Sequence, residues 1–138
     1  MPAKQPYIDD AHMAELRSLQ ALKLPLDVSR LVRLCDELNA VYRGECVMAV
    51  AMLCRAIKDH CPPVFGQTNF ANVVSHTSAQ STRKILEQLE SGLKNVADRH
   101  LHAHIRPREA IPAMTEVEFR PAMNVLIGEI CVALRSKT

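Results

Sequence analysis

The chain has 138 residues, enough for one domain with a substantial hydrophobic core. Its composition is 48% hydrophobic but only 4% aromatic, without tryptophan, which favours an aliphatic helical bundle over a β-sandwich. A net charge of +2 is too small to indicate nucleic-acid binding by itself. No apolar run approaches the roughly 20 residues that cross a bilayer, so we expect no membrane segment.

Cysteine usage points to a reducing compartment. The five cysteines are odd in number, and no two have the Cys-x-x-Cys spacing. This pattern indicates free thiols in the cytoplasm, and the N-terminal stretch lacks the apolar core of a signal peptide. Four cysteines lie in apolar stretches and are expected to be buried: Cys35, Cys46, Cys54 and Cys131.

Apolar periodicity predicts an arm and first helix over residues 1–26 and a helical bundle over residues 27–138, together one domain. Residues 1–8 are expected to form a loose arm, and Asp9 or Asp10 to cap the first helix. Asp27 is expected to cap a second helix that ends near Arg43. Its predicted apolar face consists of Leu31, Leu34, Cys35, Leu38 and Val41.

A third helix is expected from Glu45 to about His60, where two prolines follow and stop it. Every residue from Cys46 to Cys54 is apolar, which is typical of a helix that is buried all round. We therefore predict that three large side chains are almost fully buried: Met48, Met52 and Leu53. Near its end, a structural polar group is expected from Arg55, Asp59 and His60.

The second half of the chain is predicted to hold a short helix near Asn69–Val74 and a longer one from Ala79 to about Ile105. The longer helix should bury Ile85, Leu89, Leu93 and Val96. After it, Thr115-x-x-Glu118 matches a capping box. The last helix should start near Pro121 and bury Met123, Leu126, Ile127, Ile130, Cys131 and Leu134. The sequence thus predicts an all-α, single-domain bundle of about five helices.

The strongest candidate site is Asn95–Glu109, which holds three histidines and three arginines. A histidine can take the proton of a ribose 2′-hydroxyl group, and a guanidinium group can stabilise charge on phosphoryl oxygens. This chemistry suits metal-independent RNA cleavage. The candidate catalytic residues are Arg99, His100, His102 and His104, and the candidate substrate-binding residues are Asn95, Arg106 and Arg108.

Geometry leaves alternatives open for this segment. On a continuous helix Arg99 and His104 would point about 140° apart, so a frayed helix end or a partner chain would have to bring them together. Alternatively, Arg99 pairs with an acid at the edge of the core and His100 packs on the apolar face. The three histidines at positions 100, 102 and 104 lack a nearby carboxylate or cysteine to complete a zinc site, so we predict no metal.

Two runs resemble a known family. R-A-I-K-D-H-C-P-P-V-F-G at Arg55–Gly66 and A-D-R-H-L-H-A-H-I-R at Ala97–Arg106 resemble helical domains of bacterial abortive-infection and other defence proteins, and more broadly the HEPN superfamily. The family motif is Arg, a polar residue, three to five further residues and His, and it is matched by Arg99, His100 and His104. The resemblance covers Asp27–Leu134.

The resemblance implies a HEPN-like bundle that forms a homodimer in the cytoplasm. The dimer would cut RNA in a shared cleft, without metal or cofactor, as part of an antiviral defence or toxin system. Another protein of that system would be a further partner. Family members without nuclease activity act as sensor, binding or dimerisation modules, and this alternative stays open.

Overall fold

The structure, a computed structural model, describes residues 5–138, and every regular element in that range is helical. Short 3-10 turns, η1 and η3, span Pro62–Phe65 and Met114–Val117, and a π-helical turn, η2, spans Ala97–Leu101. The predicted all-α, single-domain bundle is confirmed. Its α-helices are α1 (Asp10–Ala21), α2 (Ser29–Arg43), α3 (Val47–His60), α4 (Phe70–His76), α5 (Gln80–Val96) and α6 (Arg120–Arg135).

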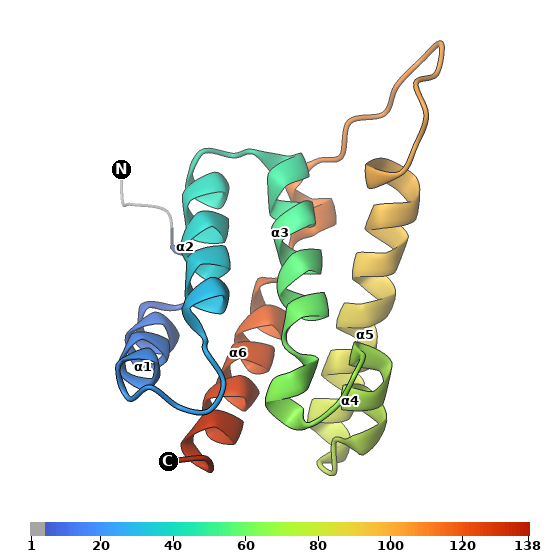
Figure 1. Cartoon of the computed structure of the whole chain (residues 1–138). Helices are drawn as coiled ribbons and strands as arrows, with labels where there is room; N and C mark the ends of the chain where they lie inside the picture. Colours follow the sequence, from blue (N-terminus) through green and yellow to red (C-terminus); the bar gives the residue numbers. More distant parts are fainter. Residues whose placement is uncertain (1–4) are drawn as a thin grey trace.

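The longer helices form one bundle with a shared core. α2, α3 and α5 lie side by side, and α6 crosses behind them (Figure 1). α1 packs against α2 and α6, while the short α4 packs against α5. The beginning of α3 and the end of α5 therefore lie at the same end of the bundle (Figure 1). The candidate site lies at this end.

α6 closes the bundle and agrees closely with the sequence prediction. It begins at Arg120, and Pro121 fits its first turn. The amide of Asn124 joins it to the N-terminal segment: Oδ1 accepts from the N–H of Asp9, and Nδ2 donates to the carbonyl oxygen of Tyr7, both at 2.8 Å. All six side chains predicted for the apolar face are buried: Met123, Leu126, Ile127, Ile130, Cys131 and Leu134.

The segment before α1 is anchored in the core, unlike the loose arm predicted for residues 1–8. Tyr7 and Ile8 are fully buried. The hydroxyl group of Tyr7 donates to the carbonyl oxygen of Val117 at 2.7 Å and accepts from the N–H of Phe119 at 2.9 Å. Residues 1–4 of the predicted arm lie outside the described residues.

One side of α3 is exposed, so the prediction that this helix is buried all round is wrong. Met52 is 53% exposed, and Met48 and Leu53 are only half-buried. Cys46, just before the helix, is exposed as well, unlike the other predicted cysteines. An apolar helix tends to be buried, but its composition does not show whether the other helices of the same chain cover every side of it. The buried side carries Val50, Ala51, Cys54 and Ile57.

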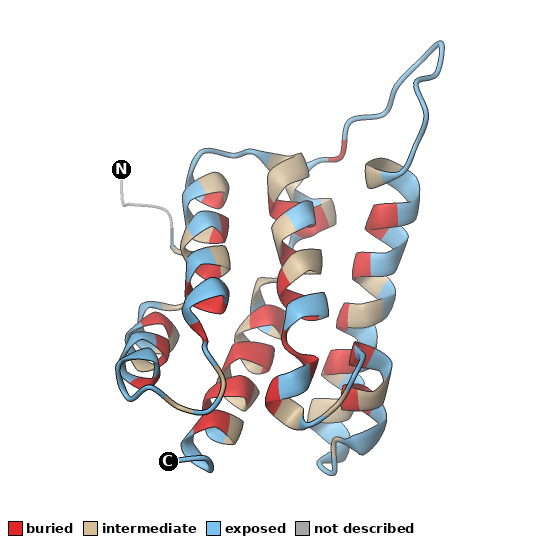
Figure 2. Cartoon of the chain, viewed as in Figure 1, coloured by how far each residue is buried: buried red, intermediate tan, exposed pale blue. Residues whose placement is uncertain are grey.

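α5 ends earlier than predicted. The α-helix stops at Val96 and η2 continues only to Leu101, whereas the expected end was near Ile105. Pro107 excludes a helix beyond its own position but does not require one up to it. Residues 102–113 instead form a loop, almost wholly exposed, that projects from the end of the bundle (Figures 1 and 2). Within α5, Leu86 takes the buried place predicted for Ile85.

Candidate functional site

The candidate site is built from three consecutive segments: η2, the loop of residues 102–113, and η3. In η2 the N–H of His102 donates to the carbonyl oxygen of Ala97 at 3.1 Å, which closes a widened, π-type turn. Such turns are rare and often occur at functional sites. This turn places Arg99 and His100 at the end of the helix and sends the next residues out into the loop.

Glu116 of η3 holds the centre of the site. Its Oε1 lies 3.6 Å from Nη1 of Arg99 and 3.7 Å from Nε2 of His100. Its Oε2 accepts from the N–H of Ala113 at 2.9 Å, so Glu116 forms the link that the capping-box prediction assigned to Glu118. That hydrogen bond, and then the nearby Arg99 and His100, hold the pKa of the Glu116 carboxyl group below its usual range.

The side chain of His100 is buried although it lies at the edge of the bundle. Its side chain is 5% exposed, whereas that of Arg99 is 69% exposed. Nε2 of His100 is buried and has no hydrogen-bond partner among residues 5–138. Oε1 of Glu116, at 3.7 Å, is too far away for a hydrogen bond in this conformation. A buried polar atom without a partner is costly, and such atoms often mark a functional site.

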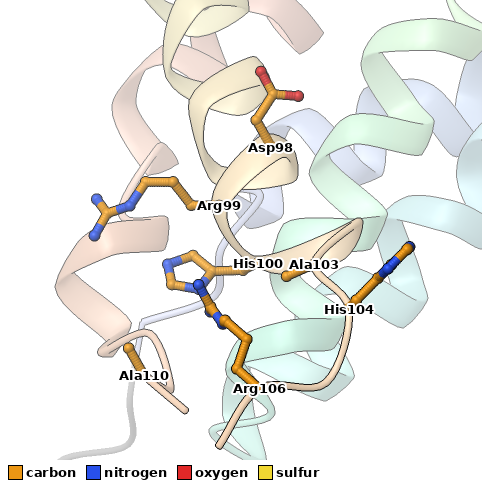
Figure 3. Close-up of a pocket in the computed structure, with 7 residues that line it drawn as sticks. All are labelled: Asp98, Arg99, His100, Ala103, His104, Arg106 and Ala110. Carbon is orange, nitrogen blue, oxygen red and sulfur yellow. The ribbon is translucent and has the colours of Figure 1, made fainter. Parts of the chain in front are cut away.

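A main cleft of about 400 Å³ opens between η2 and the loop. Arg99 and His104 point to opposite sides of it, and the guanidinium group of Arg106 points toward the ring of His100 (Figure 3). A side hollow of about 210 Å³ adjoins the cleft and is lined by Asn95, Arg99, His100 and Glu116, among others. The residues lining the main cleft are Asp98, Arg99, His100, Ala103, His104, Arg106 and Ala110.

The other candidate residues differ in how firmly they are held. Arg106 is fixed by Glu109, which accepts from its backbone N–H at 2.8 Å and from its guanidinium group at 3.4 Å. His102, His104 and Arg108 are exposed, and their side chains form no hydrogen bond or ion pair with any residue from 5 to 138. These three side chains are therefore free to meet a ligand or a second chain.

The polar group predicted near the end of α3 lies at the opposite end of the bundle from the cleft (Figure 1). Arg55 and Asp59 are 3.7 Å apart, in the expected contact. Lys58 is closer to the same carboxylate, at 3.1 Å, and its ammonium group lies 5.7 Å from the centre of the Phe70 ring. His60 is exposed beside them.

Glu116 is the site residue that sequence reasoning missed. It follows His100 by 16 positions, and the exposed loop lies between them. The only local signal was the capping-box match at Thr115-x-x-Glu118, which we set aside when we placed the start of the last helix near Pro121. No spacing rule connects such a stretch to a helix end across an irregular loop.

No group of three or more metal-ligand side chains lies together within residues 5–138. Over the same range, no helix has the length and apolar character to cross a membrane. Comparisons with protein-family models, with curated proteins and with solved structures find no match for this chain.

Proposed function

We propose that this protein is a HEPN-like, metal-independent ribonuclease of a bacterial defence system, with RNA bound in the main cleft. The observation that carries the proposal is the composition of that cleft: two arginines and two histidines line one solvent-open space, Arg99, His100, His104 and Arg106. Guanidinium groups bind phosphate, and imidazole groups exchange protons near neutral pH. Net charge gave no such indication, because the basic side chains are concentrated locally.

The proposed reaction moves two protons. One imidazole takes the proton of a ribose 2′-hydroxyl group, and the 2′-oxygen forms a bond to phosphorus. The bond from phosphorus to the 5′-oxygen breaks, and a second imidazole returns a proton to the leaving oxygen. Arg99 stabilises the charge that builds up on the other phosphoryl oxygens. The products are a cyclic 2′,3′-phosphate and a free 5′-hydroxyl group.

We propose further that the working form is a homodimer. Arg99 and His104 point apart within one chain (Figure 3). A two-fold axis beside the loop would place Arg99 of one chain near His104 of the other. Exposed apolar side chains on the loop and on α3 would cover one another in such a dimer. Met52 is 53% exposed on α3, and Ile105 and Ile111 are 94% and 75% exposed on the loop.

A second candidate function is a non-catalytic binding or dimerisation module. It is favoured by the placement of Arg99 and His100, which both lie against Glu116 of their own chain. In that case Glu116 would have a structural role at the end of α5, and the exposed loop residues would form the binding surface. RNA binding without strand cleavage is the outcome that selects this candidate.

The test is cleavage of a labelled single-stranded RNA in the presence of a metal chelator. Arg99→Ala should lower the rate about 100-fold or more, because it removes the group that stabilises phosphoryl charge. Arg30→Ala is the matched control, since Arg30 is exposed and distant in sequence from the cleft. Mixing Arg99→Ala with His104→Ala chains should restore part of the activity lost in each. If the wild-type protein leaves RNA intact, the proposed ribonuclease activity is wrong.

The dimer is tested separately by sedimentation. Ile105→Asp should lower the dimer fraction at micromolar concentration, because a charge at the interface is costly to bury. Leu22→Asp is the control, since Leu22 is 58% exposed but lies at the end of α1. A wild-type chain that sediments as a monomer would exclude the shared cleft.

A further inference from the structure

We propose that Glu116 is a positioning residue that fixes the tautomer and orientation of His100, so that His100 serves as the base in the main cleft. The base role rests on the proposed ribonuclease function, whereas the contact between the two side chains does not. No motif in the sequence connects these residues. The argument uses the placement of one carboxylate and the burial of one imidazole.

The carboxylate of Glu116 is held on a rigid support. Oε2 is fixed by the N–H of Ala113 at 2.9 Å, which leaves Oε1 to face η2. The next residue, Val117, is fully buried, and its carbonyl oxygen accepts the hydroxyl proton of Tyr7 at 2.7 Å. Glu116 is therefore attached to the core through its neighbour rather than carried on the exposed loop.

The imidazole of His100 needs a partner for Nε2. This atom is buried and lacks a hydrogen bond within the described part of the chain, and a carboxylate oxygen of Glu116 lies 3.7 Å from it. A shift of less than 1 Å would give an ordinary hydrogen bond. In the tautomer with its proton on Nε2, this nitrogen donates and Oε1 of Glu116 accepts. The same tautomer leaves Nδ1 without a proton. Nδ1 is then the atom that can accept a proton from a substrate.

The carboxylate also matters after the proton has moved. A protonated imidazole that is buried is costly unless an opposite charge lies beside it. The ionisable groups around His100 are Arg99 and Asp98 on its own turn, Glu116 on η3, and His104, Arg106 and Glu109 on the loop. From α3, apolar Met48 lines the adjoining hollow. Of the three carboxylates, Glu116 is the one that lies within 4 Å of the ring nitrogen.

A single isosteric substitution tests the assignment. In Glu116→Gln the N–H of Ala113 still requires an oxygen, so the amide oxygen stays there and the NH₂ group faces His100. That group donates, so Nε2 must now accept and the ring proton must move to Nδ1. The readout is the pair of imidazole ¹⁵N shifts of His100 at about pH 8, where an ordinary imidazole is neutral. His100→Asn identifies the signals.

We expect Nε2–H in the wild-type chain and Nδ1–H in Glu116→Gln. Glu109→Gln is the matched control: it changes the carboxylate that binds Arg106 and should leave the tautomer of His100 unchanged. In RNA cleavage, Glu116→Gln should lower kcat about 10²- to 10⁴-fold with little change in KM, as expected when a base is held in the wrong tautomer. Glu116→Asp should restore part of this loss.

The outcomes separate the two proposals. A proton on Nδ1 in the wild-type chain, or an unchanged tautomer in Glu116→Gln, would overturn the positioning role. A tautomer that switches while kcat stays unchanged would overturn the assignment of His100 as the base. Wild-type protein that shows the predicted tautomer but never cuts RNA would overturn the ribonuclease and leave the pairing of Glu116 with His100 supported.

Discussion

A single hydroxyl group, that of Tyr7, connects the N-terminal segment to the turn that carries Glu116. It donates to the carbonyl oxygen of Val117 in a buried hydrogen bond and accepts from the N–H of Phe119 in a partly buried one. Tyr7→Phe removes both bonds and leaves the N–H of Phe119 and the carbonyl oxygen of Val117 only their contact with each other, at 3.0 Å. The variant should therefore lower the free energy of unfolding by about 1–3 kcal/mol, measured by urea denaturation. Ser136→Ala removes an exposed hydroxyl group and is the control. Equal stability of the two variants would contradict this role.

Two glycines within helices should respond in opposite ways to alanine. A Cβ at Gly92 would lie 2.5 Å from Cε1 of Phe119, so Gly92→Ala should destabilise the fold by about 1–3 kcal/mol. A Cβ at Gly128 would meet only the end of the His12 side chain, at 3.4 Å, so Gly128→Ala should be neutral or stabilising by up to about 1 kcal/mol. Thermal denaturation of the two variants measures the difference, and the reverse order would show that Phe119 can move aside.

At the scale of the helix, substitutions on the buried and the exposed face of α3 should differ in their effect on stability. Ile57 is fully buried and Met52 is 53% exposed. Ile57→Ala should therefore cost about 2–5 kcal/mol, whereas Met52→Ala should cost less than about 1 kcal/mol in the monomer. Chemical denaturation at two protein concentrations measures both. A cost for Met52→Ala that grows with concentration would show that a second chain covers this face.

Helices whose ends are marked by proline or by a change of polarity were predictable from sequence. α6 is the clearest example: Pro121 marks its start, and its six buried side chains recur at helical spacing. The prediction for α3 was wrong because an unbroken apolar run has no polar side to show which face meets the core. The end of α5 was predicted too late in the chain because Pro107 prevents the helix from continuing past it but does not require the helix to reach it.

The site was only half predictable. Arg99 and His100 could be found because arginine and histidine are concentrated in one segment. Their partner Glu116 could not be found, because its position depends on the path of an exposed loop and on the burial of Val117 beneath it. Tertiary packing decides such contacts, and local patterns carry little information about them.

At the scale of the whole molecule, buried thiols should limit stability at high pH. Burial raises the pKa of Cys35, Cys54 and Cys61 to about 12 and that of Cys131 to about 11. These thiols stay protonated in the folded chain but ionise at about pH 9 when unfolded. Their contribution is therefore complete below about pH 9 and is lost as pH rises toward 12, by about 1.4 kcal/mol per thiol and pH unit.

Urea denaturation at pH values on either side of this window, with a reducing agent present, measures the effect. The free energy of unfolding should fall steeply on the alkaline side. Cys131→Ala should make the fall less steep, even though it lowers stability at neutral pH. A flat profile would show that water reaches the thiols in the folded chain.

The joining of the first and last segments has a consequence for how the protein is made. The N-terminal segment finds its partners more than 100 residues later, in Val117, Phe119 and Asn124. A ribosome that has synthesised α1 to α5 holds a chain whose core still lacks α6. Such a nascent chain lacks the hydrogen bonds by which Asn124 of α6 holds the N-terminal segment, and with them part of the support of η3. If the chain cuts RNA as proposed, we expect it to become active only after α6 has left the ribosome.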